Sequence, residues 1–299
     1  MTTIGADLAA DQAVFADPLP ATQRRSSGRW GTALRTVTAV LICLVMFFPL
    51  YWMVLTAFST KADLYAPGLS LWPQHFTWDN FSLPIRQFPV WTWFRNSLVI
   101  ALLVTGITVT VNLLAGYAFA KLPFRGRAPL FLLLLSTMMI PVQAIMVPQF
   151  NTVVDLGLYG TIWAVVIPSC AAVFGIFLAR QFFIAIPDEI TEAAKVDGAG
   201  ALRTFVTIVL PLSKPLIAVL ILLTFMAEWN DFAWPLIVLF SNNELFTLPV
   251  GLVTDLKGQY SANYGALMAM SLIMVIPMAV LFVAFQRYFV QGLARSGIK

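Results

Sequence analysis

Two carboxylates and a carboxamide lie together in the middle of a long apolar stretch of this 299-residue sequence. Glu228, Asn230 and Asp231 interrupt a run of apolar residues from about 216 to 240. On insertion scales a carboxylate at the bilayer centre costs about 2.5 to 3.5 kcal/mol, and the apolar residues of the run offset roughly what two acids cost. The run can therefore insert, but its acids must face a helix bundle or a water-filled path rather than lipid.

Two interpretations of this acidic group are open. In the first, Glu228 and Asp231 form a polar knot that stabilises a kink at Pro235, where Asn230 or a water compensates for the backbone donor that proline lacks. In the second, the group lines a translocation path. Carboxylates and an amide would then hydrogen-bond to the hydroxyl groups of a polar solute, and Trp229 or Trp234 would offer an apolar face.

Two further polar residues are weaker candidates for the same path. Asn112 lies in an earlier apolar run, and Gln143 lies in another run where Pro141 and Pro148 interrupt regular helix. Isolated polar residues of this kind usually hydrogen-bond to a neighbouring helix. Their role therefore depends on what lies next to them in the fold.

The composition is that of an integral membrane protein. Hydrophobic residues make up 60% of the sequence and charged residues 11%, and a soluble protein of this length carries about twice that charge. Cys43 and Cys170 lie far apart in apolar runs, and His75 is the only histidine. These counts argue against a disulfide framework and against a metal site built from several histidines within the chain. No catalytic residue, cofactor or metal ligand is predicted.

Six apolar runs are long enough to cross a bilayer as helices, which takes roughly 20 residues each. They lie near residues 35–58, 97–120, 128–150, 160–183, 216–240 and 265–289. None shows the alternation of a barrel strand, and only helices or closed barrels satisfy their backbone in lipid. The sequence therefore predicts an all-α bundle of six transmembrane helices, preceded by a polar tail over residues 1–30 that contains no run able to bury a core.

The basic residues predict the orientation of these spans. Lys61, Arg86, Arg95 and Lys257 fall on one side, and the other basic residues fall on the side that holds both termini and the loop from 184 to 215. By the positive-inside rule the richer side is cytoplasmic. Both termini and that loop are therefore expected on the cytoplasmic side of the membrane.

The loop at 184–215 predicts a polar hairpin of two short helices. Pro187 suits a first helical turn, and we expect a helix over 188–197 followed by a turn at Gly198 and Gly200. Ile190, Ala193 and Ala194 are expected to share one face of this helix, and Glu192 and Lys195 another. Leu202, Phe205, Val206 and Val209 then predict a second amphipathic helix that Pro211 ends.

A free helix of about ten residues is only marginally stable in water, because helices below roughly 12 to 15 residues rarely form alone. The hairpin must therefore dock against something. The small residues Ala193, Ala194 and Gly198 favour close contact with a protein partner over burial in the membrane surface.

The spacing of these residues resembles a known motif. Glu192-Ala193-Ala194, then Gly198, Ile208 and Leu210-Pro211 follow the EAA loop pattern of bacterial ABC importer permeases. The resemblance implies that residues 187–211, between the fourth and fifth transmembrane helices, form a coupling helix that contacts a cytoplasmic ATPase. The residues that it assigns to this contact are Glu192, Ala193, Ala194, Asp197, Gly198, Leu210 and Pro211.

Three other segments resemble carbohydrate-uptake permeases of the MalG-like type. They are residues 115–127, 228–236 and 286–299, so the likeness extends over most of residues 31–299. The polar tail is longer than is usual in that family, and the ending LARSGIK departs from its Thr-x-Gly-Ala-Val-Lys-like pattern. The implied partners are a homologous second permease subunit, a dimeric ABC ATPase and an extracytoplasmic solute-binding protein, with no nucleic acid.

ATP must be bound outside this chain, because the sequence contains no Gly-x-x-x-x-Gly-Lys-Ser/Thr pattern. The resemblance places ATP and magnesium on the partner ATPase, and it implies that this multi-pass chain lies in the inner membrane of a prokaryote. One rival interpretation is a secondary transporter that uses Glu228 and Asp231 as an ion relay. Another is a membrane enzyme or scaffold, against which the lack of a nucleophile-base constellation argues.

Overall fold

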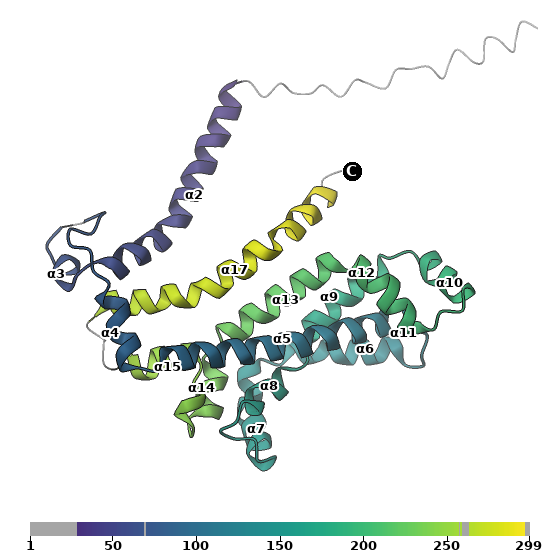
Figure 1. The fold of residues 1–299 in the computed structure, drawn as a ribbon. Helices are drawn as coiled ribbons and strands as arrows, with labels where there is room; N and C mark the ends of the chain where they lie inside the picture. The colour runs from purple at the N-terminus through teal and green to yellow at the C-terminus, as the bar shows by residue number, and fades with distance from the viewer. Residues whose placement is uncertain (1–28, 69, 257, 259–262, 297–299) are drawn as a thin grey trace, which may run out of the picture. The chain divides into compact units, whose positions relative to one another are not determined.

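A computed structural model describes residues 29–68, 70–256, 258 and 263–296 (Figure 1). The described chain is helical, and its one β-contact is an isolated antiparallel bridge between Ser59 and Phe76. It divides into two compact units, one up to Tyr51 and one from Trp52 onward. The predicted tail over residues 1–30 lies outside the described residues except for its last two.

The helices follow one another with short connections. In chain order they are α2 (Arg29–Phe58), α3 (Lys61–Leu64), α4 (Asp79–Gln87), α5 (Val90–Lys121), α6 (Arg127–Ser136), η1 (Thr137–Met139), α7 (Val142–Asp155), α8 (Trp163–Ser169), α9 (Val173–Ile184), α10 (Asp188–Val196), α11 (Ala201–Thr204), η2 (Phe205–Val209), α12 (Leu210–Leu212), α13 (Lys214–Trp229), α14 (Ala233–Leu239), η3 (Asn243–Leu245), α15 (Leu248–Gly251), η4 (Leu252–Leu256) and α17 (Tyr264–Ser296).

Four stretches of the described chain are long and apolar enough to span a membrane. They are Gly31–Phe58, Val90–Lys121, Trp163–Ile184 and Tyr264–Tyr288. Two bent helix pairs bring the number to six if each pair counts as one span. The all-α membrane fold is confirmed, and the third and fifth apolar runs are interrupted rather than continuous helices.

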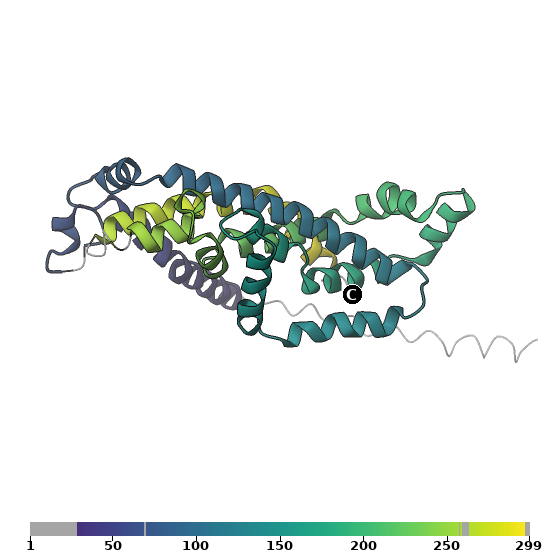
Figure 2. The ribbon, with the colours of Figure 1, turned by 90° about the horizontal axis from the view of Figure 1, so that it is seen from below.

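The third apolar run is broken next to Pro141. α6 and η1 end at Met139, α7 begins at Val142, and the two parts meet at 100°; Figure 2 shows α7 turned away from α6. Ile140 has the extended backbone (φ −86, ψ 118) that a following proline favours. The break that Pro141 predicted is therefore present, but α7 continues through Pro148.

The fifth run is broken before Pro235 rather than at it. α13 ends at Trp229, and α14 begins at Ala233 after a short non-helical segment. Pro235 is the third residue of α14, where the backbone N–H has no intrahelical acceptor in any case. The proline therefore costs no hydrogen bond, and the predicted kink is a helix break that holds Asn230 and Asp231.

The second unit is built around α5. This helix packs against α9, α13, α8 and α15, and 44% of its apolar window is buried, the largest share among the four spans. Close approach to α9 depends on Gly116, because a Cβ atom there would meet the Cβ atom of Ala179 and the Arg180 backbone. α5 is thus the shared packing partner of the other helices in this unit.

The loop between α2 and α4 is held by an acid and the only histidine. Asp63 accepts a hydrogen bond from the backbone N–H of His75 at 2.7 Å and lies 2.9 Å from its Nδ1. These bonds hold the pKa of Asp63 below its usual value. His75 therefore organises a loop, and the described residues contain no cluster of three metal-ligating side chains.

Two glycines of α5 give a matched test of this packing. Gly116→Ala should lower stability by about 1 to 3 kcal/mol, because the added methyl group overpacks the α5–α9 contact. Gly106→Ala should be neutral or stabilising, since no atom lies within 4 Å of its added Cβ and alanine is the better helix former. Thermal unfolding of the purified protein measures both. Equal melting temperatures for the two variants would contradict the proposed close contact.

Candidate functional site

The predicted polar hairpin is present and protrudes beyond the C-terminal end of α5 in both views (Figures 1 and 2). Its first helix, α10, begins at Asp188 and ends at Val196, one residue earlier than predicted. Asp188 and Glu189 lie in its first turn and Lys195 in its last, as the helix dipole favours. These charges support a helix that is too short to be stable alone.

Gly198 closes α10 with a Schellman motif. Its φ is +77°, in the left-handed region that glycine adopts without steric cost. The Ala199 N–H donates to the carbonyl of Ala194 at 2.9 Å, and the Gly198 N–H donates to that of Lys195 at 3.0 Å. The glycine of the motif is therefore required by the backbone turn.

The second arm of the hairpin is less regular than predicted. α11 passes into a π-helical segment, Phe205–Val209, and then into α12, which contains Pro211. The chain turns by 82° into α13 only after Leu212, so Pro211 does not end the helix. It lies in the first turn of α12, where proline is tolerated.

The π-helical segment also splits the predicted apolar stripe. Phe205 and Val209 are buried, whereas Leu202 and Val206 are 67% and 50% exposed. The i→i+5 bonds of a π-turn change the angular spacing of side chains, so an i, i+3, i+4 pattern no longer marks one face.

The EAA residues divide between an outer and an inner face. Glu192, Ala193, Asp197, Gly198 and Pro211 are exposed, Leu210 is half-buried and Ala194 is buried. The predicted common face of Ile190, Ala193 and Ala194 is wrong, because Ala194 turns inward with Thr191. The outer face instead carries Val196, which is 88% exposed.

The acidic group lies at the break between α13 and α14. The Asn230 side chain donates to the carbonyl of Met226 at 2.8 Å and caps α13. The Asp231 carboxylate lies beside the first N–H groups of α14, at the positive end of that helix. Both residues therefore satisfy helix ends, which supports the polar-knot interpretation for them.

Glu228 lies in a different environment. It is on the last turn of α13, close to Ser169 and Cys170 at the α8–α9 break. Its Oε2 atom is buried and has no hydrogen-bond partner among the described residues. Of the two acids, Glu228 is the one whose carboxylate the local backbone does not use.

Asn112 belongs to the same region, and Gln143 does not. Asn112 is fully buried against Gly175, and neither atom of its amide group has a partner in the described structure. One turn earlier, the Thr108 hydroxyl donates to the Ser169 carbonyl at 2.8 Å. We call Thr108, Asn112, Ser169 and Glu228 the buried polar cluster. Thr108 and Asn112 are buried on neighbouring turns of α5, and Ser169, which accepts from Thr108, and Glu228 are half-buried beside them. Gln143 is exposed at the start of α7.

Sequence reasoning missed Thr108 and Ser169. The only signal for Thr108 is its spacing four residues before Asn112 on α5, which places both on one face. Hydroxyl residues are common in membrane helices and often bond their own backbone, so that spacing alone does not single it out.

Trp229 faces the core of the subunit. Its indole N–H donates to the Met274 carbonyl at 2.9 Å, and its ring stacks on Phe225 with centroids 5.7 Å apart. The side chain is fully buried. The structure therefore does not present Trp229 on an open face beside Glu228.

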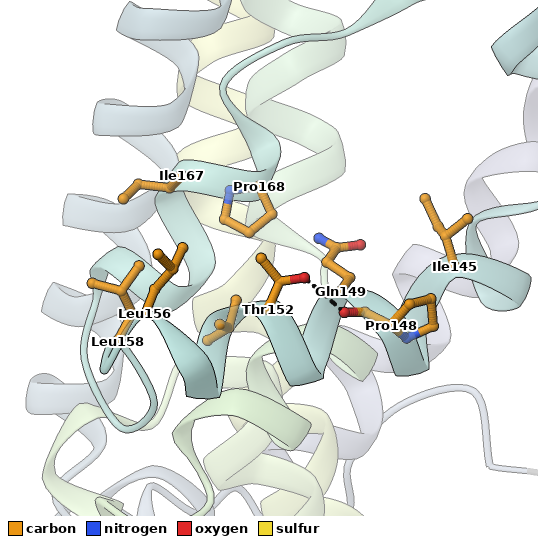
Figure 3. A pocket seen from close by; sticks show the side chains of 9 residues that line it. Ile145, Pro148, Gln149, Thr152, Leu156, Leu158, Ile167 and Pro168 are labelled. Carbon is orange, nitrogen blue, oxygen red and sulfur yellow. Dashed lines mark hydrogen bonds between the residues drawn. The ribbon is translucent and has the colours of Figure 1, made fainter.

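A groove of about 470 Å³ lies between α7 and α8 (Figure 3). Its lining is apolar apart from Gln149 and Thr152, and the Thr152 hydroxyl is occupied by the Pro148 carbonyl at 2.9 Å. No ionisable side chain lines it, so it offers no acid, base or nucleophile.

Comparison with known proteins identifies relatives along most of the chain. Residues 112–295 match the family of binding-protein-dependent transport system inner membrane components. The arabinooligosaccharides transport system permease protein AraQ of Halalkalibacterium halodurans is 37% identical over 269 residues, which cover 89% of this chain and 96% of the relative. The lactose transport system permease protein LacG of Rhizobium radiobacter is 35% identical, with 86% and 92% covered.

Two further comparisons agree. The sn-glycerol-3-phosphate transport system permease protein UgpE of Escherichia coli is 32% identical over 275 residues, which cover 89% of this chain and 97% of that protein. In fold, the chain resembles one from a bacterial ABC transporter involved in the import of the acidic polysaccharide alginate. That likeness has a TM-score of 0.76 at 23% identity and covers 89% of this chain and 98% of the other. The chain belongs to the family of binding-protein-dependent transport system inner membrane components and is a multi-pass permease subunit of an ABC importer.

Proposed function

We propose that this chain forms one half of a pore that imports a sugar or sugar derivative, driven by ATP that partner subunits hydrolyse. The observation that carries the proposal is the hairpin: α10 is closed by Gly198 and presents Glu192, Ala193 and Val196 outward. An exposed apolar residue beside small and acidic ones suits a cleft on a partner protein. ATP binding would move the hairpin, and hydrolysis would reset the bundle.

The partners follow from what the chain lacks and what it exposes. A homologous second permease would complete the pore, and a dimeric cytoplasmic ABC ATPase would bind ATP and magnesium, since no P-loop pattern is present in the sequence. An extracytoplasmic binding protein would deliver the solute. The positive-inside pattern supports a hairpin and termini on the cytoplasmic side.

The class of substrate rests on two observations. The relatives are named for arabinooligosaccharides, lactose and sn-glycerol-3-phosphate, which all carry several hydroxyl groups. The buried polar cluster also offers a carboxylate oxygen and an amide without partners among the described residues, groups that suit a hydroxyl-rich solute. We propose Glu228 and Asn112 as the stronger pathway residues of this subunit, and Asn230, Asp231 and Gln143 as weaker ones. Trp229 is not among them, because its side chain is fully buried in the core.

The substrate class is tested by uptake of labelled arabinose oligosaccharides, lactose and sn-glycerol-3-phosphate into cells with and without this chain. Uptake of at least one compound should depend on the chain, survive collapse of the ion gradients and require an intact partner ATPase. Uptake that stops with the ion gradients would instead support the secondary transporter that uses Glu228 and Asp231.

The hairpin turn is tested by two glycines. Gly198→Ala should uncouple ATP hydrolysis from uptake, because a residue with a Cβ atom in the left-handed region costs roughly 1 to 2 kcal/mol. Gly200→Ala is the matched control, since its φ is −69°. Neither added Cβ meets another atom within 4 Å. Uptake per ATP hydrolysed is the measurement, and equal coupling in both variants would argue against the role of this turn.

Substitutions of the two acids of the fifth run are predicted to have different effects. Glu228→Gln should change the rate of uptake while leaving protein yield and melting temperature intact, because its buried Oε2 has no partner among the described residues. Asp231→Asn should mainly reduce stability, by about 0.3 to 1 kcal/mol, since it removes a charge from a helix N-terminus. If Glu228→Gln transports as well as the unchanged protein, Glu228 does not lie on the path.

A further inference from the structure

The last turn of α5 contacts both arms of the hairpin. The ammonium group of Lys121 donates to the Ile186 carbonyl at 2.6 Å and to the Asp188 carboxylate at 2.5 Å, just before and at the start of α10. The Tyr117 hydroxyl donates to the Ala201 carbonyl at 3.4 Å, at the start of α11. Tyr117 and Lys121 are four residues apart and share one face of α5. The last turn of α5 is therefore hydrogen-bonded to the hairpin at the start of its first arm and at the start of its second arm.

Lys121 is buried, although its carboxylate partner is not. The Lys121 side chain is 7% exposed and that of Asp188 is 75% exposed. The hydrogen bond from Lys121 holds the pKa of Asp188 below its usual value, but solvent screens so exposed an ion pair. Burial of the ammonium group instead requires the Ile186 carbonyl, which lies between α9 and α10. The bond to Ile186 is therefore the main attachment.

Aromatic contacts also hold the hairpin against α5. The Tyr117 ring lies 5.0 Å from that of Phe205 on the returning arm and 6.0 Å from that of Phe183 on α9. All three rings belong to one buried cluster with Val209. The hairpin is therefore held to α5 both by the hydrogen bonds of Lys121 and Tyr117 and by the packing of these aromatic rings.

α9, which leads into the hairpin, is tied to α5 as well. The Arg180 Nε atom donates to the Phe119 carbonyl at 3.2 Å, near the end of α5 where helix carbonyls lack an intrahelical donor. Its guanidinium group lies 4.2 Å over the Phe131 ring of α6. Three elements therefore meet at the end of α5.

We propose that Lys121 and Tyr117 are positioning residues that lock the hairpin to α5, so that the hairpin and α5 move as one rigid body. Neither residue belongs to the EAA motif. The inference rests on the proposed function, since it explains how a displacement at the hairpin reaches α5, the span that packs against α9 and α13. A helix carries such a displacement along its length because its backbone hydrogen bonds hold it straight.

The rigid-body claim is tested by the distance between two spin labels in the assembled transporter, after replacement of Cys43 and Cys170 by serine. One label is placed at Glu189 on α10 and the other at Leu102 on α5, both exposed positions. Leu102 lies roughly 28 Å along α5 from Lys121. The distance distribution should be narrow and the same without nucleotide and with magnesium-ATP and vanadate. A shift with nucleotide in the unchanged protein would overturn the proposal.

Substitutions then test Lys121 itself. Lys121→Met should broaden the distribution, because loss of a charge-assisted hydrogen bond shifts the ratio of attached to detached hairpin by roughly tenfold. Lys121→Arg should restore a narrow distribution, since it keeps buried donors and charge. Lys214→Met is the matched control, as this exposed lysine lies outside the hairpin. A Lys121→Met distribution as narrow as the control would contradict the role of Lys121.

Asp188→Asn covers the case in which Lys121→Met does not assemble. It leaves the Ile186 carbonyl in place, so the distribution should stay narrow; broadening would contradict the assignment of Ile186 as the main partner. Failure of the lock differs from failure of the proposed function. If only the lock is wrong, Gly198→Ala still uncouples transport while the label distances disagree; if the hairpin does not couple, Gly198→Ala has no effect on uptake per ATP.

Discussion

A backbone inside a bilayer has no water to hydrogen-bond to, and this constraint governs where the helices of the protein can break. The fifth apolar run breaks where protein groups cover the exposed backbone. At the α13–α14 break, Asn230 bonds a carbonyl at the end of α13 and Asp231 lies at the first N–H groups of α14. The same constraint explains why Asn112 is fully buried.

The inward polar groups give the bundle a centre that is not fully satisfied. Asn112 and Glu228 come from α5 and α13, and Ser169 comes from the α8–α9 break between them. Each unsatisfied buried group costs free energy, and under the proposed function the transported solute would supply the missing hydrogen bonds. We infer that the cost is tolerated because of transport.

Much of this organisation follows from the sequence. The break at Pro141 and the hairpin with its turn at Gly198 are local features, set by proline and glycine backbone preferences. The position of the break in the fifth run was not predicted, because the sequence alone does not show whether Pro235 kinks the interior of a helix or lies in the first turn of a new one. What decides between them is the capping by Asn230 and Asp231, which depends on tertiary structure.

The side-chain directions were harder to predict. Trp229 adjoins the acidic group in sequence yet points into the core, since its indole N–H finds the Met274 carbonyl on α17. The π-helical segment after α11 changes the spacing of side chains, so that Val206 is exposed while Phe205 and Val209 are buried, which no i, i+3, i+4 pattern anticipates. Lys121 lies 65 residues from Ile186, and no spacing rule connects residues so far apart.

We propose that the outer face of α10 contacts a partner ATPase. Cysteine cross-linking tests this contact in membranes that still import solute, with Val196→Cys on the exposed face and Ala194→Cys on the buried face as the control. We expect a cross-link from position 196 to the ATPase and none from position 194. Active membranes in which neither Val196→Cys nor Ala193→Cys captures an ATPase subunit would contradict the proposed contact.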